Sequence, residues 1–388
     1  MYLTQKIALK PTKEQEKLFN RWSGTVRFIY NLGLELRIKC YEQSETTVSM
    51  SDIKKYITSL KKDSDYSWLS NTPRQTIDEA LRDLDKAFKK FFEEKEAGFP
   101  KFKSKKNSNK SFFVRPDSLN SVDNYHIKFN GITVKTYESI KIVNNQVKNP
   151  RIKFDGKYWY ITFSVEINSE NKEIPVIKNK FKHIKHLRET TTTPPLGIDL
   201  GVKELAVLSN KAVYHNINKE SEIQRLERRK EKLQQIVSRK YNKNKQGNKS
   251  IKTKNIQKLE KKVGLIDRRL SNIRNTYIHQ ITTEIVRTKP SKIVIEDLAI
   301  SNMLKNKYLS KAIQDQKLYF FRQVLTYKCS LYGIPLKIVN RFYPSSKTCS
   351  SCGFINKQLR LEDRIFNCPR CDFTIDRDLN ASINLSLQ

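Results

Sequence analysis

The sequence has no long apolar run, few histidines and far fewer acidic than basic residues. No stretch of about eighteen consecutive apolar residues occurs, which excludes a membrane-spanning helix. The 5 histidines are scattered, and no Ser/His/Asp arrangement typical of a nucleophilic hydrolase is evident. Residues 2–9 alternate between polar and apolar side chains, which predicts a strand and not a signal peptide.

The shortage of acidic residues gives the chain a large positive charge. It holds 75 Lys and Arg against 40 Asp and Glu, a formal net charge of +35 over 388 residues. A compact chain with this excess repels itself unless a polyanion neutralises it, so nucleic acid is the leading partner. A merely soluble, lysine-rich surface is the alternative. The hydrophobic fraction of 37% suffices for a globular chain of two or three domains.

Four of the 6 cysteines form two CxxC pairs with fifteen residues between them: Cys349, Cys352, Cys368 and Cys371. Each pair can point two thiolates at one ion, so the spacing predicts a tetrahedral zinc site. Such a site has no open coordination position and is therefore structural. Two disulfides or four unrelated thiols are the alternative. We expect Cys40 and Cys329 to be buried free thiols.

The first half of the chain is predicted to hold a helical segment inserted between strands. After the strand at 2–9, Thr12 caps a long helix, and further helices are predicted at 51–60 and 73–96. Alternating segments with hairpin turns then predict a small antiparallel barrel. Its expected strands are 111–115, 125–129, 132–135, 139–143, 151–154 and 158–167.

The second half is predicted to combine a sheet with long helices. Strands at 196–200, 204–208 and 211–216 read as an antiparallel meander, and heptad-like spacing predicts a helical hairpin over 220–287. The later elements expected are a buried strand at 292–296, a helix at 312–331, a strand at 334–339 and a helix at 379–387.

Three carboxylates stand at strand or helix ends in this half: Asp199 in GIDLG, Glu296 in VIEDL and Asp378 in DRDLN. Acidic groups that converge need cations to stay ionised, and oxygen ligands suit Mg²⁺ or Mn²⁺. Two such ions can hold a scissile phosphate and activate a water. The flanking Gly197 and Gly201 would let a phosphate backbone approach. Taken singly, the three carboxylates also fit a turn residue, a strand-end charge and a helix cap.

Five segments together resemble the TnpB (OrfB) proteins of insertion sequences, relatives of the type V CRISPR effectors: GIDLG, IVIEDL, YPSSKTCSSCG, CPRC and DRDLNAS. PTKEQ and FFEEKEAGFPKFKSK extend the resemblance towards the N-terminus. It implies a multi-domain α+β and α/β chain. The implied parts are a β-barrel wedge domain at 1–11 and 97–170, an inserted helical recognition lobe at 12–96, a linker at 171–195, a RuvC-like RNase H fold at 196–344 and 373–388, and a Cys₄ zinc module at 345–372.

The resemblance also implies an RNA-guided, metal-dependent DNA endonuclease of a transposable element, which cuts beside a short adjacent motif. The family's catalytic positions carry over to Asp199, Glu296 and Asp378, with Asp376 as the fallback in DRD, and the four cysteines carry over as zinc ligands. Two Mg²⁺ or Mn²⁺ ions and one Zn²⁺ are the implied cofactors. The implied partners are a guide RNA from the element's end and double-stranded DNA, and no membrane is expected as a partner. The protein is expected to be a monomer in the cytoplasm of a prokaryote. A strand-transfer transposase and a non-cutting RNA-guided repressor remain the alternatives.

Separated basic segments are candidates for nucleic-acid contact. They include a basic helix face and the loop KFKSKKNSNK, with the candidate residues Arg21, Arg27, Lys101, Lys103, Lys105 and Lys106. A solvated loop is the alternative for residues 101–110. A structured RNA held through its phosphates would account for so many separated basic segments.

Overall fold

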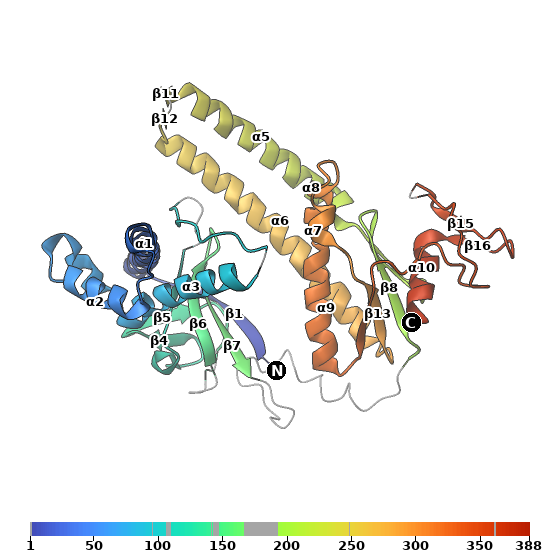
Figure 1. Ribbon diagram of the computed structural model, residues 1–388, viewed down its shortest axis with the longest axis horizontal. Helices are drawn as coiled ribbons and strands as arrows, with labels where there is room; N and C mark the ends of the chain where they lie inside the picture. Colours follow the sequence, from blue (N-terminus) through green and yellow to red (C-terminus); the bar gives the residue numbers. More distant parts are fainter. Residues whose placement is uncertain are drawn as a thin grey trace. The chain divides into compact units, whose positions relative to one another are not determined.

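The computed structural model describes residues 2–94, 96–105, 110–140, 142, 147–166, 193–247, 249–360 and 362–388 (Figure 1). The described residues form two compact units, residues 2–166 and residues 193–388. Most of the predicted linker 171–195 lies outside the described residues. None of the described helices is long and apolar enough to cross a membrane.

The described residues of the first unit form three α-helices and a seven-stranded antiparallel sheet in the order β2-β6-β7-β1-β5-β4-β3. The helices are α1 (Lys13–Ser44), α2 (Met50–Leu60) and α3 (Arg74–Glu93). The strands are β1 (Tyr2–Lys10), β2 (Ser111–Phe113), β3 (Asn120–Ser121), β4 (His126–Phe129), β5 (Ile132–Thr136), β6 (Val147–Phe154) and β7 (Trp159–Glu166).

The antiparallel pairing of the predicted barrel is present, whereas its closure is not shown by the described residues. Strands β2 and β3 end the sheet, and no pairing between them closes it among the described residues. The strand expected at 139–143 is absent from the described part of that stretch, where Ile140 and Ile142 are nevertheless buried in the core. Closure into a barrel therefore stays a prediction.

Helix α1 begins where the sequence predicts and helps to cover the sheet. The backbone N–H of Gln15 donates to the Thr12 hydroxyl at 3.2 Å, and the Thr12 N–H donates to the Gln15 side chain at 3.1 Å. This capping box satisfies two donors of the first turn. Phe19 of α1 then packs edge-on against Trp159 of β7, with ring centroids 5.2 Å apart. The sheet core therefore includes residues from the helical segment.

The second unit has a five-stranded mixed sheet in the order β10-β9-β8-β13-β14. Strands β8 (Leu196–Leu200), β9 (Glu204–Leu208) and β10 (Val213–His215) form the predicted meander. Strands β13 (Ile293–Glu296) and β14 (Leu336–Val339) run parallel to β8. Helices α5 (Ser221–Lys243) and α6 (Lys254–Arg287) form the predicted hairpin.

Helices cover both faces of this sheet (Figure 1). The C-terminal part of α6 and helix α9 (Leu318–Tyr332) pack on the face that carries Ile198 and Ile295. Helix α10 (Arg377–Ser386) packs on the opposite face, where Leu385 contacts Val294. Strand residues two apart face the same side, so Asp199 and Glu296 belong to the α10 face.

The helix predicted at 312–331 is broken in the structure. Helix α8 (Ser310–Gln316) ends at Lys317, which has a left-handed φ of 53° and precedes α9. The Lys317 ammonium donates to Ser271 at 2.8 Å and to Asn275 at 2.7 Å, both on α6. A tertiary contact thus stabilises a conformation that the helical pattern does not reveal.

Gly197 of β8 marks the closest approach between the sheet and α10. A Cβ atom at this position would lie 1.9 Å from the carbonyl oxygen of Ser382 and 2.5 Å from the amide nitrogen of Ser386. Both are backbone atoms of α10, so no side-chain rotation relieves the overlap. The close approach at Gly197 is therefore made by a helix and not, as expected from the sequence, by a phosphate backbone.

We predict that Gly197→Ala destabilises the protein by about 3 kcal/mol or more, because overpacking moves α10 away from the sheet. Gly264→Ala on α6 is the matched control, since no atom lies within 4 Å of its added Cβ. A helical Gly→Ala change there should add about 1 kcal/mol to the free energy of unfolding. Urea denaturation of both variants measures the difference. Equal stabilities would contradict the packing of α10 on Gly197.

Candidate active site and metal centre

Two of the predicted carboxylates lie at the ends of neighbouring parallel strands. The register pairs Ile295 of β13 with Ile198 of β8, so the next residues along the two strands are Glu296 and Asp199. Both side chains point to the α10 face by strand alternation. Residues 97 positions apart in the sequence therefore meet at one edge of the sheet.

The third carboxylate comes from the first turn of α10. Asp378 lies one helical turn before Ser382, the residue whose carbonyl faces Gly197. Residues four apart lie on one helix face, so Asp378 points towards the same sheet as Ser382. Asp199 lies two residues beyond Gly197 on β8. The close packing at Gly197 thus brings Asp378 towards Asp199.

The electrostatics of Asp199 reflect this convergence. Burial, followed by the charges of Asp378 and Glu296, raises the pKa of Asp199 to about 7. The side chain is half-buried by accessible surface, yet enough protein surrounds it for burial to be the largest cause. A raised pKa among several carboxylates is typical of a cation-binding site.

The structure distinguishes the two aspartates of DRD. Asp376 is the N-cap of α10, and its carboxylate accepts from the N–H groups of Asp378 and Leu379, each at 3.0 Å. Asp378 is not the cap; its Oδ1 accepts from Arg377 at 3.0 and 3.2 Å. The helix-cap interpretation therefore applies to Asp376, and Asp378 is available to the site.

Glu296 has a neighbour that is neutralised separately. Asp297 pairs with Arg341 at 2.6 Å and with Arg322 at 2.7 Å, and these hydrogen bonds lower its pKa. Burial, followed by the charge of Asp297, raises the pKa of Glu296. The two arginines therefore serve Asp297, and Glu296 stays with the acidic group on the α10 face.

Side chains hold every carbonyl of the turn that follows Asp199. Gln316 donates to the carbonyls of Gly201 at 3.1 Å and Val202 at 3.3 Å. Asn216 also donates to Val202 at 2.8 Å, and Lys219 donates to Lys203 at 2.7 Å. Gln316 is 3% exposed, so this bond is shielded from water. The turn next to Asp199 is thereby fixed in place.

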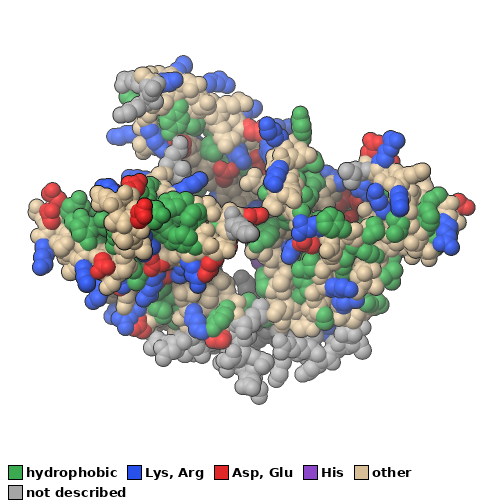
Figure 2. Space-filling view, viewed as in Figure 1, with side chains coloured by type: hydrophobic (Ala, Val, Ile, Leu, Met, Phe, Trp, Pro, Cys, Tyr) green, Lys and Arg blue, Asp and Glu red, His purple; other side chains and the backbone are tan. Residues whose placement is uncertain are grey.

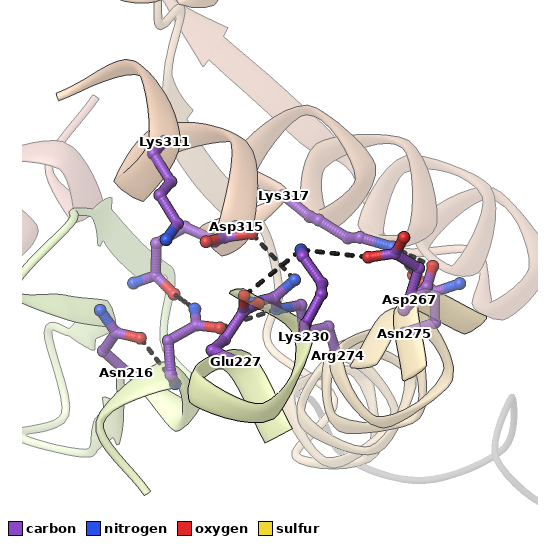
Figure 3. Close-up of polar contacts among 12 residues, drawn as sticks. Asn216, Glu227, Lys230, Asp267, Arg274, Asn275, Lys311, Asp315 and Lys317 are labelled. Atoms are coloured by element: carbon purple, nitrogen blue, oxygen red, sulfur yellow. Dashed lines mark hydrogen bonds and ion pairs between the residues drawn. The ribbon is translucent and has the colours of Figure 1, made fainter. Parts of the chain in front are cut away.

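Arg274 of α6 anchors the same network (Figure 3). Its guanidinium donates to Asn218 at 2.7 Å, to Glu227 at 2.9 Å and to Asp315 at 2.8 Å. Asn218 in turn donates to Gln316 at 3.3 Å. The network joins the α5–α6 hairpin, helix α8 and the turn after Asp199, which the sequence pattern alone did not indicate.

The two CxxC segments fold into matching turns. The N–H of Cys349 donates to the Phe354 carbonyl at 2.8 Å, and that of Cys368 donates to the Phe373 carbonyl at 2.9 Å. The residue after each pair has a positive φ, 75° at Gly353 and 56° at Asp372. CxxC followed by Gly or Asp and then Phe is therefore one structural motif used twice.

The four cysteine sulfurs form one cluster, within which all ligand atoms lie within 4.8 Å of one another. It is the only such set of potential ligands in the described part of the chain, and the three carboxylates do not meet this distance. Cys349 lies 3.7 Å from Cys371, and Cys352 lies 3.6 Å from Cys368. These distances exclude disulfides, and they match the ~3.8 Å edge of a tetrahedron with 2.3 Å metal–sulfur bonds.

Outside this cluster, the two remaining cysteines differ from each other. Cys329 is buried, as expected. Cys40 is only half-buried and contacts the hydroxyls of Ser44 and Thr46, so the expectation of a buried thiol is wrong there.

Helix α10 binds the first cysteine turn as well as the sheet. Asn380 accepts from the Ser350 N–H at 3.0 Å and donates to the Thr348 carbonyl at 2.7 Å. Asn384 donates to the carbonyls of Ser345 and Thr348 at 2.8 and 2.6 Å. Both asparagines are buried. The cysteine module is therefore attached to the helix that carries Asp378.

The predicted nucleic-acid contacts separate into two groups. Burial, followed by the charge of Lys105, lowers the pKa of Lys110, and the charge of Arg27 lowers it as well. Arg27 and Lys105 therefore lie near Lys110. Lys103 instead lies over the Tyr30 ring at 3.5 Å. Of the other candidates, Arg21 and Lys101 are exposed, and Lys106 lies outside the described residues.

Basic residues are spread over both units. Figure 2 shows Lys and Arg side chains scattered across the visible face. Some cations in this distribution are already paired: Arg37 contacts Asp85, and Arg151 contacts Asp83 at 2.8 Å. The α1 face predicted to be basic is therefore partly neutralised at Arg37.

Family models match three successive parts of the chain. They are described as "Helix-turn-helix domain" of OrfB (residues 1–46), "Probable transposase" of the OrfB type (163–307) and "Cas12f1-like, TNB domain" (319–385). The chain is 27% identical to "Putative RNA-guided DNA endonuclease InsQ" of Escherichia coli, covering 98% of this chain and 90% of that protein. The chain thus resembles the TnpB (OrfB) family over most of its length.

Further proteins are similar to this chain. A protein of Streptomyces pristinaespiralis named "Putative RNA-guided DNA endonuclease" is 29% identical over 98% of this chain and 87% of its own length. Solved structures of CasPhi-2 bound to crRNA and of a CRISPR-Cas12f ternary complex share 12% and 16% identity. They cover 100% and 97% of this chain and 98% and 82% of those chains, with TM-scores of 0.43 and 0.39, which are too low to support an inference about the fold.

Sequence reasoning missed the residues that support the candidate site. Asn380 lies within the DRDLN motif, but the motif did not predict its hydrogen bond to the Thr348 carbonyl. Gln316 and Arg274 lie in segments without a motif, and only their tertiary contacts connect them to Asp199.

Replacing Arg274 by Ala should lower the free energy of unfolding by about 3 kcal/mol, because Glu227 and Asp315 lose their buried partner. Arg269→Ala is the matched control on the same helix. Arg269 pairs with Glu222, but its side chain is 58% exposed against 9% for Arg274. Its loss should cost less than about 1 kcal/mol. Urea unfolding curves measure both; similar losses would refute the anchoring role of Arg274.

Proposed function

We propose that this TnpB-family protein is an RNA-guided DNA endonuclease that cuts target DNA next to a short adjacent motif. The observation that carries the proposal is the convergence of Asp199, Glu296 and Asp378 on one face of the sheet, expressed in the raised pKa of Asp199. The names of the relatives add independent support.

The donor set of the acidic group fits hard divalent cations, because all three side chains offer carboxylate oxygens. When bound, two Mg²⁺ or Mn²⁺ ions would activate a water and stabilise the leaving oxygen of a phosphodiester. Asp199, Glu296 and Asp378 would hold these ions. Asp376 stays the fallback, although its Oδ1 already accepts two backbone hydrogen bonds.

The cysteine cluster is proposed to hold one structural Zn²⁺. Four thiolates with tetrahedral spacing leave no open coordination position for a substrate. The role of this ion would be to fold the segment around Phe366, which packs with Cys349 and Cys368 in a small core. Asn380 and Asn384 would then transmit that order to α10.

The proposed domain organisation follows the family resemblance. Residues 1–11 and 97–170 would form the wedge domain, and residues 12–96 the recognition lobe. Residues 196–344 and 373–388 would form the RuvC-like nuclease domain, with the zinc module at 345–372. Separated basic segments suit an RNA scaffold and a guide–target heteroduplex, both held through phosphates by a monomeric protein.

A transposase that joins DNA ends is the second candidate, because such an enzyme could use the same three carboxylates. Strand-transfer products would identify it. A non-cutting RNA-guided repressor is disfavoured, because it needs no converging acidic group.

Purified, extensively dialysed protein should retain about one equivalent of zinc per chain, measured by elemental analysis. Cys368→Ser should release the metal and slow DNA cleavage indirectly, through the contacts between α10 and the cysteine module. Cys329→Ser is the control, because Cys329 lies in a different core. Well-folded protein with no zinc would contradict the assignment.

Asp199→Ala, Glu296→Ala and Asp378→Ala should each abolish Mg²⁺-dependent cleavage and leave nucleic-acid affinity nearly unchanged. Affinity arises from Lys and Arg contacts to phosphates, whereas the carboxylates hold the ions. Asp376→Ala should lower stability by about 1 kcal/mol through loss of the helix cap and retain cleavage. Cleavage and filter-binding assays on the same preparations separate these effects. If Asp376→Ala abolished cleavage and Asp378→Ala did not, the assignment within DRD would be reversed.

Guidance is tested with two plasmids that carry swapped target sequences beside the same adjacent motif. The protein is assayed at fixed salt, alone and with RNA transcribed across the element's end. Changing the guide segment should move the cut to the matching plasmid. Site-specific cleavage by RNA-free protein, or cleavage that ignores the swap, would overturn RNA guidance.

A further inference from the structure

Arg377 pairs with one carboxylate of the acidic group and has no assigned role. Its Nη2 and Nε atoms lie 3.0 and 3.2 Å from the same oxygen, Oδ1 of Asp378. The Arg377 side chain is 15% exposed and that of Asp378 is 21% exposed. The pair is therefore substantially shielded from solvent, and its electrostatic attraction exceeds that of an ordinary surface pair.

The backbone of Arg377 is fixed independently of this ion pair. Its N–H donates to the carbonyl of Arg364 at 2.8 Å, which continues the pairing of β15 (Ile365–Asn367) with β16 (Thr374–Asp376). Asp376 then caps the helix that Arg377 begins. The guanidinium thus extends from a base that the cysteine module and α10 hold together.

The carboxylates next to Arg377 identify what it opposes. Its guanidinium pairs with Asp378 at 3.0 Å, and Asp376 directly precedes it in the chain. The other arginines at this sheet edge, Arg322 and Arg341, pair with Asp297. Arg377, by contrast, pairs with a carboxylate of the acidic group itself.

We propose that Arg377 is the resident counter-ion of the acidic group. It holds Asp378 in position before divalent cations bind and competes with them for the same carboxylate. This inference rests on the proposed nuclease function, because it requires that Asp378 bind a cation. It makes Arg377 a positioning residue that sets the concentration of Mg²⁺ or Mn²⁺ at which the site fills.

Competition makes two predictions of opposite direction for Arg377→Gln. Removing a positive charge beside the carboxylates should tighten Mn²⁺ binding by about tenfold. Removing the counter-ion should also lower the unfolding temperature more in the absence of divalent cations than in saturating Mn²⁺, because Mn²⁺ replaces the missing charge. A merely structural arginine would lower both temperatures equally and leave the Mn²⁺ affinity unchanged.

The experiment measures Mn²⁺ binding by calorimetry and thermal unfolding with and without Mn²⁺, on the full-length protein without chelator. Arg341→Gln is the matched control, because it removes an arginine–aspartate pair at the same edge that does not face Asp199. Its Mn²⁺ affinity should equal that of the unchanged protein. Arg377→Lys keeps the charge without the two-nitrogen contact, and should give an intermediate affinity; it also serves if Arg377→Gln does not fold.

The outcomes separate this inference from the proposed function. If the unchanged protein binds Mn²⁺ and Asp199→Asn does not, the acidic group is a cation site. Unaltered or weaker Mn²⁺ binding by Arg377→Gln would then overturn the counter-ion role alone. If the unchanged protein binds no Mn²⁺, or if Asp199→Asn binds Mn²⁺ equally well, both the proposed nuclease centre and this inference fail.

Discussion

The contact between Gly197 and the backbone of α10 determines where the acidic group forms. No side chain larger than hydrogen fits at this point, because backbone atoms of Ser382 and Ser386 occupy the space. The sheet and the helix therefore approach until their main chains touch. Asp199 follows Gly197 by two residues, and Asp378 precedes Ser382 by one turn, so the approach directs both carboxylates to one place. The buried asparagines of α10 then attach the cysteine module to the same helix.

Convergence of carboxylates has an electrostatic cost that the rest of the unit offsets only in part. The pKa of Asp199 in the folded protein is raised from the ordinary value of 3.8 to about 7. Ionisation of Asp199 therefore lowers the stability of the folded protein as the pH rises from about 4 towards 7. Arg377 reduces this cost, and a bound cation would remove more of it. The hydrogen bonds from Arg274 to Asn218 and from Gln316 to the Gly201 carbonyl hold the turn that adjoins Asp199.

The sequence identified elements with a strong local signal and missed those that depend on tertiary contacts. The capping box at Thr12, the hairpin of α5 and α6 and the strand ending at Glu296 were all predictable, because periodicity and capping are local. The break at Lys317 was not, because α6 stabilises it through Ser271 and Asn275. The cysteine cluster was predictable from spacing, whereas closure of the first sheet into a barrel was not decided by alternation.

The same distinction holds within the acidic group. Motifs named Asp199, Glu296 and Asp378, but the sequence could not separate a cap from a ligand in DRD. The hydrogen bonds of Asp376 to two backbone N–H groups supply that distinction. Gly197 was noticed as a site of close approach, and only the packing of α10 identified its partner.

The central claim is that Asp199, Glu296 and Asp378 form a divalent cation site on the α10 face of the sheet. The most direct measurement is anomalous X-ray scattering from crystals of the protein soaked in Mn²⁺. The account predicts manganese peaks coordinated by carboxylate oxygens of all three residues, and their loss in Asp199→Asn. Crystals that contain Mn²⁺ at other positions, with none bound between these three carboxylates, would contradict it.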